Sequence, residues 1–228
     1  MSSRKKRSRI LIVDDHPLIR EGVAAMIGRQ SDMEVCGEAS DVNGSIAQIT
    51  SLQPDLVILD ISLKAGTGLD VIKKFQPAQQ AKGSNGSFGV RILVHSMYDD
   101  SLYAERVLQA GAMGYVNKQE APELLVAAAR RVLSGKIYVS PQIAERLLER
   151  AIGHRSKPVA DSVESLSDRE LQVFRLIGEA VASGRIAERL FISVHTVETH
   201  RENIKKKLGL KSGPELSQRA VQWVLENG

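Results

Sequence analysis

The sequence predicts a doubly wound α/β domain followed by a small all-α domain of four helices. Five short apolar runs alternate with segments of helical periodicity between residues 9 and 136, and the alternation ends there. Most of the runs are continuously apolar, which is typical of parallel strands buried on both faces. Repeated strand–helix pairs of this kind favour a five-stranded parallel sheet with helices on both faces.

Each element of the α/β part follows from its local pattern. The expected strands are residues 10–13, 35–38, 56–59, 92–95 and 115–116. The expected helices, which have a helical apolar period, are residues 17–27, 43–51, 68–75, 102–110 and 122–133. The Gly- and Ser-rich stretch 76–89 is longer than a helix-to-strand connection requires, and we expect a surface loop there.

The C-terminal part contains only helical patterns. One helix is expected at 140–151, and small, polar and charged residues at 153–165 indicate a linker. Four further helices are expected at residues 168–181, 185–191, 194–208 and 214–226. The sequence therefore predicts an α/β domain at 9–136, a linker with one helix at 137–164 and an all-α domain at 165–228.

Composition excludes several classes of protein. Hydrophobic residues make up 43% of the chain and charged residues 25%, as in ordinary globular proteins. Cys36 is the only cysteine, so no internal disulfide can form, which fits a reducing cytosol. No apolar stretch approaches the ~18 residues that a membrane span needs, so we expect a cytoplasmic protein without a membrane partner. The basic cluster at 4–9 is interpreted as a solvated tail, with a phosphate-binding arm or a nuclear signal left open.

Polar side chains follow four of the expected strands. Asp14 and Asp15 follow the first strand, Asp60 the third, Ser96 the fourth and Lys118 the fifth. The carboxyl ends of parallel strands form one rim of the sheet, where ligands bind. Clustered carboxylates suit Mg²⁺, and a carboxylate can itself accept a phosphoryl group. A single Asp at a strand end is usually only a cap or turn residue, so the prediction depends on the combination.

Four segments carry a family resemblance. ILIVDDHPLIREGV, PDLVILDISLKAGTGLDVI, ILVHSMYDD and AGAMGYVNK resemble the receiver domains of response regulators, in particular the NarL-type branch, and so imply a flavodoxin-like fold over 9–136. The resemblance implies that Asp60 is the phospho-acceptor, that Asp15 binds Mg²⁺ directly and that Asp14 holds a metal-bound water. The carbonyl of Ser62 would complete the protein ligands.

The same resemblance assigns the residues that respond to phosphorylation. Lys118 would pair with the phosphoryl group, Ser96 would turn toward it, and Tyr115 occupies the aromatic position whose rotation accompanies that switch. Gln119 stands where many receivers have proline, so a cis peptide bond after Lys118 cannot be assumed.

The helix expected at 194–208 is amphipathic. Val194, Val197, Ile204 and Leu208 fall on one face, and the opposite face carries His195, Glu198, Thr199, Glu202 and Lys206. Such a helix suits the major groove, but any surface helix has the same pattern. Before it, Ser167 and Glu170 have the spacing of a capping box.

LSDRELQVFRLI and IAERLFISVHTVETHRENIKKKLGLKS resemble LuxR-type helix-turn-helix domains, over 165–228. By that resemblance Glu198, Thr199 and Glu202 face base edges, with His195 beside them. Arg201, Lys205 and Lys206 are then expected to contact phosphates. Where the family usually has a polar cap and a lysine, this chain has VASG at 181–184, and Ser183 is expected to cap the helix instead.

The expected function is that of a response regulator, a DNA-binding transcription factor and not an enzyme, switched when a sensor histidine kinase phosphorylates Asp60. Residues 165–228 hold ten Lys and Arg against eight Asp and Glu, a net charge of only +2, so we expect a homodimer on a two-fold DNA site. Pairing is expected through 214–226, with Leu216, Val221, Val224 and Leu225 on the core side and Ala220 and Trp223 on another.

Three alternatives remain at this point. Trp223 could equally close the helical core. The C-terminal helices could contact a protein, making the chain an adaptor. A phosphohydrolase using Asp60 is disfavoured, because residue 62 is serine and not the second acid/base aspartate.

Overall fold

The computed structural model describes residues 6–63, 66–75, 90–97, 101–153 and 162–227. The chain divides into two compact units, of which the first comprises Met1–Tyr98 and Tyr103–Ala144 and the second comprises Asp99–Leu102 and Glu145–Gly228. We describe each unit by itself. The loop expected at 76–89 and most of the linker expected at 153–165 lie outside the described residues.

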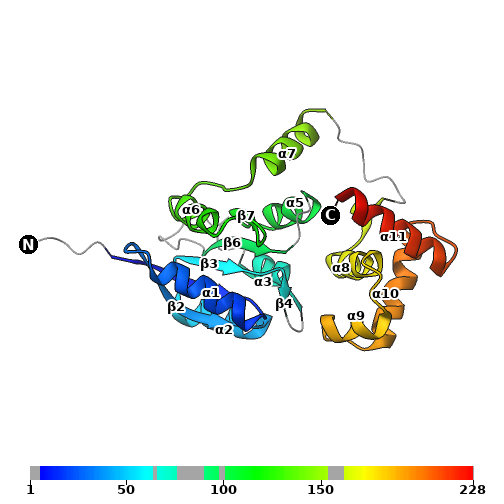
Figure 1. Cartoon of the computed structure of the whole chain (residues 1–228), viewed down its shortest axis with the longest axis horizontal. Coiled ribbons are helices and arrows are strands. Elements are labelled where there is room, and N and C mark those ends of the chain that lie inside the picture. Colours follow the sequence, from blue (N-terminus) through cyan, green and yellow to red (C-terminus); the bar gives the residue numbers. More distant parts are fainter. Residues whose placement is uncertain (1–5, 64–65, 76–89, 98–100, 154–161, 228) are drawn as a thin grey trace, which may run out of the picture. The chain divides into compact units, whose positions relative to one another are not determined.

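The first unit is built on a five-stranded parallel sheet (Figure 1). Its strands are β1 (Ser8–Val13), β2 (Met33–Ala39), β3 (Leu56–Leu59), β6 (Arg91–Ser96) and β7 (Gly114–Asn117), in the order β2-β1-β3-β6-β7. This is the strand order of doubly wound flavodoxin-like proteins, so the predicted fold is confirmed. β3 is buried along its whole length, whereas the edge strand β2 buries only Met33 and Ala39.

Helices cover both faces of the sheet. They are α1 (Pro17–Gly28), α2 (Val42–Leu52), α3 (Gly68–Phe75), α5 (Ser101–Gln109) and α6 (Pro122–Leu133). α1 and α6 share one hydrophobic cluster, in which Ile27 and Leu125 pack with Ile12, Ile58 and Val116 of the sheet. Crossovers between parallel strands are right-handed. The chain moves from β1 to one edge of the sheet at β2 and then back across the sheet to β3, β6 and β7. The later crossover helices α2, α3 and α5 therefore lie on the face opposite to α1.

A short antiparallel ladder, which the sequence analysis did not predict, follows β3. β4 (Ser62–Leu63) pairs with β5 (Gly66–Thr67) immediately before α3. The backbone turns so closely here that a Cβ on Gly68 would collide with the carbonyl oxygen of Asp60. Gly68 therefore lets α3 begin directly beside the end of β3.

The second unit is helical. A 3-10 turn η1 (Val163–Ser165) precedes α8 (Asp168–Gly178), α9 (Ser183–Leu190), α10 (Val194–Lys207) and α11 (Gly213–Asn227), so the four predicted helices are confirmed. The predicted capping box is also present: the Ser167 side chain accepts from the Glu170 backbone, and the Glu170 side chain accepts from the Ser167 backbone. α7 (Pro141–Gly153) corresponds to the helix expected at 140–151.

The orientation predicted for α11 is right at Leu216 but wrong at Val221, Leu225, Ala220 and Trp223. Leu216, Ala220 and Trp223 are buried, whereas Val221 and Leu225 are exposed. Trp223 packs against Phe174 of α8 with ring centroids 5.8 Å apart. Positions 216, 220 and 223 share one helical stripe, and α8 is the element that α11 contacts most. The indole closes the core of this unit, and the exposed apolar face contains Val221 and Leu225.

Candidate functional site: an acidic pocket and a recognition helix

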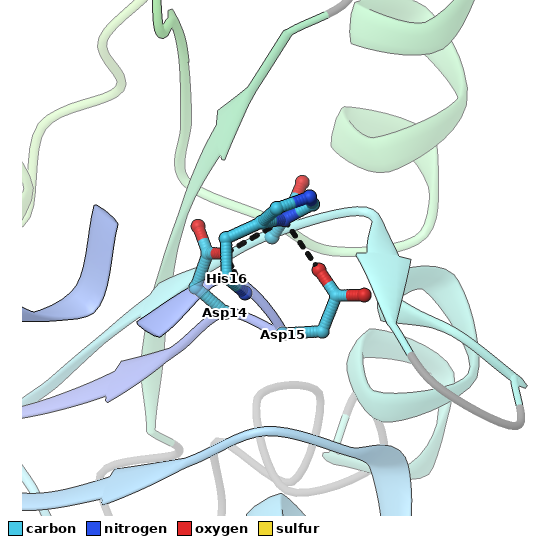
Figure 2. A group of neighbouring side chains, drawn as sticks. Asp14, Asp15 and His16 are labelled. Carbon is cyan, nitrogen blue, oxygen red and sulfur yellow. Dashed lines mark hydrogen bonds and ion pairs between the residues drawn. The ribbon is translucent and has the colours of Figure 1, made fainter. Parts of the chain in front are cut away.

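Asp14, Asp15 and His16 lie where β1 ends and α1 begins (Figure 2). The backbone N–H of His16 donates to Asp14 Oδ1 over 2.8 Å, which fixes this carboxylate. The His16 ring turns back over the same strand end, with Nδ1 2.7 Å from Asp15 Oδ1 and 3.5 Å from Asp14 Oδ1. The turn thus directs both carboxylates and an imidazole toward one point.

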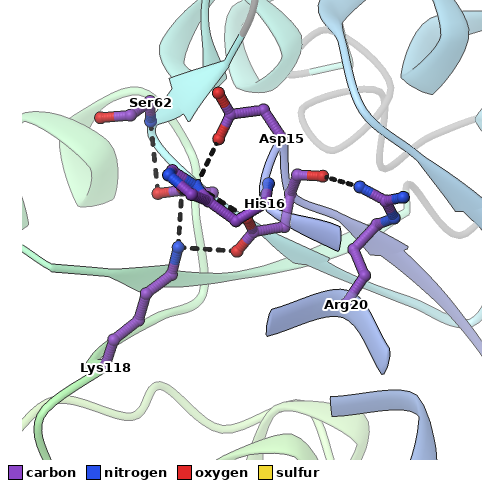
Figure 3. A network of polar contacts seen from close by, with 7 residues as sticks. Asp15, His16, Arg20, Ser62 and Lys118 are labelled. Carbon is purple, nitrogen blue, oxygen red and sulfur yellow. Dashed lines mark hydrogen bonds and ion pairs between the residues drawn. The ribbon is translucent and has the colours of Figure 1, made fainter. Parts of the chain in front are cut away.

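Lys118 joins the ends of three strands (Figure 3). Its Nζ lies 2.6 Å from Asp14 Oδ2 and 2.8 Å from Asp60 Oδ2, and its side chain is 3% exposed. The backbone N–H of Ser62 donates to the other Asp60 oxygen over 3.2 Å. The predicted convergence of Asp14, Asp60 and Lys118 is therefore observed, and Ser62 lies beside it.

Burial dominates the electrostatics of this pocket. Desolvation, opposed by Lys118 and reinforced by Asp14, raises the pKa of Asp60 from 3.8 to about 6. Burial alone would lower the pKa of Lys118, but the adjacent Asp60 and Asp14 carboxylates raise it, so the ammonium stays charged. The neighbouring His95, on β6, has its pKa lowered to about 4 by burial and by Lys118, and is neutral at neutral pH.

The donor set fits a hard divalent cation. Ligand atoms of Asp14, Asp15, His16 and Asp60 all lie within 4.8 Å of one another. Asp15 Oδ1 is buried and, apart from its ion pair with His16, has no hydrogen-bond partner among the described residues. A single ammonium does not neutralise three carboxylates, and carboxylate oxygens are the ligands that Mg²⁺ takes. The residues present therefore match the cation that the sequence analysis expected.

Ser96 and Tyr115 lie in the sheet next to this pocket. Both are buried, Ser96 at the end of β6 and Tyr115 in β7. The Ser96 carbonyl accepts from the backbone N–H of Lys118 over 2.7 Å, so the serine and the lysine are directly linked. In this structure Tyr115 packs inside the domain, and its backbone N–H donates to the carbonyl of Tyr138.

Two pocket residues were missed by the sequence analysis. His16 directly follows the acidic pair, and Arg20 donates to the Asp14 carbonyl over 2.8 Å from one turn into α1. Arg20 also pairs with Glu38 at the end of β2. His16 and Arg20 follow Asp14 by two and six residues. This spacing identifies them as pocket residues only once the turn into α1 is known.

The residues predicted to form a recognition surface lie on the outer face of α10. His195, Glu198, Thr199, Glu202 and Lys206 are exposed, and Arg201 and Lys205 are partly exposed. Val197, Ile204 and Leu208 are buried, as predicted, but Val194 is half-exposed and does not belong to the core face. Val194 is the first residue of the helix, so it lies beyond the edge of the packed stripe.

Both glutamates of this face are paired inside the domain. Ser183 of α9 donates to Glu198 Oε1 over 2.7 Å, and Arg201 Nε lies 3.4 Å from Glu198 Oε2. Glu202 pairs with Lys205 over 2.8 Å. The prediction that Ser183 caps its own helix is therefore wrong. The N-cap is Ala182, without a side-chain hydrogen bond. The Ser183 hydroxyl instead bridges α9 to α10.

The comparisons with known proteins cover both units. Residues 10–130 match the response regulator receiver domain, and residues 164–220 match the bacterial regulatory proteins of the luxR family. The oxygen regulatory protein NreC of Staphylococcus carnosus is 35% identical over 218 residues, covering 94% of this chain and 97% of that protein. In the described part of the chain, no helix is long and apolar enough to cross a membrane.

Solved structures give the same result. A LuxR-family two-component response regulator from Aurantimonas sp. is 33% identical, with a TM-score of 0.56, over 64% of this chain and 99% of that one. RcsB from Salmonella enterica serovar Typhimurium, bound to the rprA promoter with the phosphomimetic BeF3⁻, is 25% identical, with a TM-score of 0.59. The match covers 95% of this chain and 99% of that one. With a receiver fold, an acidic pocket and a LuxR-type helical domain, this chain belongs to the NarL/LuxR-type two-component response regulators, which are DNA-binding transcription factors.

Proposed function

We propose that Asp60 is the phospho-acceptor, and that a sensor histidine kinase supplies the phosphoryl group. The observation that carries this is the buried Asp60 carboxylate, held by Lys118 within a cluster of carboxylates. One Asp60 oxygen attacks phosphorus, the bond from phosphorus to the donor breaks, and an acyl phosphate forms. Lys118 already contacts Asp60 and would remain beside the new anionic oxygens, so its charge stabilises the product.

Asp15, Asp60 and the Ser62 carbonyl are the residues that would hold Mg²⁺, with Asp14 binding through a water. The cation supplies charge neutralisation for the incoming phosphoryl group. Asp14 is already engaged by Lys118 and by the His16 backbone, which is consistent with an indirect role. Asp15 Oδ1 is buried and, within the described part of the chain, contacts only the His16 ring, which supports a direct role.

Ser96 and Tyr115 are proposed to carry the change away from the pocket. A phosphoryl group adds acceptor oxygens at the strand end, and the Ser96 hydroxyl can reach them only by moving. Tyr115 lies on the neighbouring strand, where Ser96 pairs in register with Asn117. This assigns switching to residues 9–136 and DNA binding to residues 165–228, joined by 137–164.

On DNA, Thr199 and His195 are proposed to face base edges, and Arg201, Lys205 and Lys206 to face phosphates. The exposure of this face supports the assignment. The pairing of Glu198 and Glu202 changes their expected role: in the free protein their carboxylates hold Arg201 and Lys205. To read a cytosine amino group, Glu198 would first have to release a partner, because both its oxygens are engaged, whereas the contact of Glu202 with Lys205 uses only Oε1.

A homodimer on a two-fold site is proposed for the active form, because one module of low net charge makes few phosphate contacts. The corrected orientation of α11 moves the proposed pairing face to Val221 and Leu225, which are 39% and 82% exposed. We propose that the protein acts in the cytoplasm, where the DNA of a bacterial regulator lies.

Phosphate incorporation from a small-molecule acyl phosphate donor tests the proposal. Asp60→Asn should abolish incorporation, because an amide does not accept a phosphoryl group, and Asp32→Asn on the surface should not. Incorporation at the wild-type level in the Asp60→Asn protein would show that another residue is the acceptor. Footprinting with and without the donor then tests whether the acyl phosphate controls DNA binding.

A further inference from the structure

We propose that Glu198 and Glu202 make DNA binding selective, because they keep two phosphate-binding cations paired on DNA that offers no hydrogen-bond donor in exchange. The inference rests on the proposed role of the outer face of α10 in binding DNA. It goes beyond that role, because it concerns how random DNA is refused and not which atoms are contacted.

Four charged residues, Glu198, Arg201, Glu202 and Lys205, form one stripe along α10. Their spacing of three or four residues places them on the same side of the helix, with carboxylates and cations alternating. Arg201 Nε lies 3.4 Å from Glu198 Oε2, and Lys205 Nζ lies 2.8 Å from Glu202 Oε1. This charged stripe therefore presents two ion pairs to the DNA and not two free cations.

Within each ion pair, the carboxylate is the more exposed partner. The side chains of Glu198 and Glu202 are 51% and 60% exposed, whereas those of Arg201 and Lys205 are 21% and 19% exposed. A phosphate that approaches the charged stripe therefore meets a carboxylate, and the two like charges repel. Because contacts of lysine and arginine with phosphates supply the affinity for random DNA, the carboxylates weaken that affinity.

Glu198 is held in place by the preceding helix as well. Ser183 of α9 donates to Glu198 Oε1 over 2.7 Å, so both oxygens of this carboxylate are engaged before DNA binds. The carboxylate is thus fixed on the outer face of α10 by partners from two helices, and it does not swing aside to let a phosphate reach Arg201.

A preferred sequence offsets this loss of affinity by supplying a base donor. Carboxylates accept hydrogen bonds from the amino group of cytosine in the major groove. Such a donor can replace a partner of Glu198, and it can bind Glu202 at the oxygen that the ion pair leaves open. Exposed ion pairs are weak, so Arg201 and Lys205 then turn to phosphates at little cost. On DNA without the donor, the ion pairs stay closed.

Fluorescence anisotropy titrations of the full-length protein, with an acyl phosphate donor present, test the inference on two duplexes of equal length. One duplex is selected by the wild type from a randomised pool, and the other has a random sequence. Glu198→Gln and Glu202→Gln should each tighten binding to the random duplex by at least about threefold and steepen its salt dependence by about one unit, because a cation becomes available to a phosphate.

Affinity for the selected duplex should not rise, because the substitution also removes the acceptor that the base donor uses. The ratio of the two affinities should therefore fall by at least about threefold. Glutamine keeps an oxygen for the Ser183 hydroxyl, so the contact between α9 and α10 is retained. Glu34→Gln is the control: it removes the same charge from an exposed position on β2 and should change neither affinity.

Two results would overturn the inference. Equal tightening on both duplexes, or a wild type that selects no sequence, would show that the glutamates only lower the general attraction for DNA. Unchanged or weaker binding to the random duplex would show that they position Arg201 and Lys205 for phosphates. The proposed role of α10 fails separately: Lys206→Ala would then leave the affinity for both duplexes, and its salt dependence, unchanged.

Discussion

Replacing Asp60 by asparagine should stabilise the first unit at high pH in the absence of divalent cations. Burial raises the pKa of Asp60 from 3.8 to about 6, so the folded state disfavours the ionised carboxylate. One pKa unit corresponds to about 1.4 kcal/mol, so ionisation in the folded state costs up to roughly 3 kcal/mol of unfolding free energy. That cost is absent below the unfolded pKa of 3.8 and complete once the pH exceeds about 6.

The variant removes the charge, so its unfolding free energy should exceed that of the wild type by about 1–3 kcal/mol at alkaline pH, and the difference should vanish at strongly acidic pH. Urea denaturation followed by far-UV circular dichroism, with hydrogen exchange of the β3 amides, measures this. Asp32→Asn is the control, because Asp32 is half-exposed and pairs with Arg130 away from the pocket. A difference that does not depend on pH would refute the argument, as would a variant less stable than the wild type at alkaline pH.

Three other predictions concern single substitutions. Gly68→Ala should force the start of α3 away from the Asp60 carbonyl, destabilise the first unit by about 1–3 kcal/mol and slow phosphorylation, as a donor time course would show. Trp223→Ala should destabilise the second unit by about 3–5 kcal/mol in chemical denaturation, whereas an unchanged midpoint would return the indole to an interface role. Lys206→Ala should weaken binding to all duplexes alike and flatten the salt dependence by about one unit, whereas Thr199→Ala should alter the selected sequence at a cost of about 1–3 kcal/mol per lost contact. The opposite pattern in a randomised-site selection would mean that the outer face of α10 is assigned the wrong way round.

The sheet and the centre of the pocket could be predicted because both depend on short-range patterns. Continuous apolar runs are specific for buried parallel strands, and a polar residue that ends such a run must lie at the rim. Asp14, Asp60 and Lys118 meet there for that reason alone. The edge strand β2 was predicted only over 35–38, from its partly buried centre, and its two buried ends, Met33 and Ala39, lie outside that prediction.

Features that depend on contacts between elements could not be predicted. β4 and β5 have two residues each, too few to show a period. For α11, two apolar stripes were available, and only packing against α8 selects the one containing Trp223. Ser183 was expected to cap α9 because serine is a frequent cap, but a glutamate from a different helix competes for its hydroxyl.

The packing of Trp223 against Phe174 gives the protein a built-in optical reporter. The chain contains one tryptophan, and it belongs to the second unit. Intrinsic fluorescence excited at the indole band therefore follows that unit alone, without any label. Because the acceptor proposed here lies in the first unit, a change in indole emission on adding an acyl phosphate donor would be a signal transmitted between the two. An emission spectrum that stays constant while DNA affinity changes would instead indicate that the second unit keeps its own packing. Phosphorylation would then act by freeing this unit or by pairing it with its copy in a homodimer.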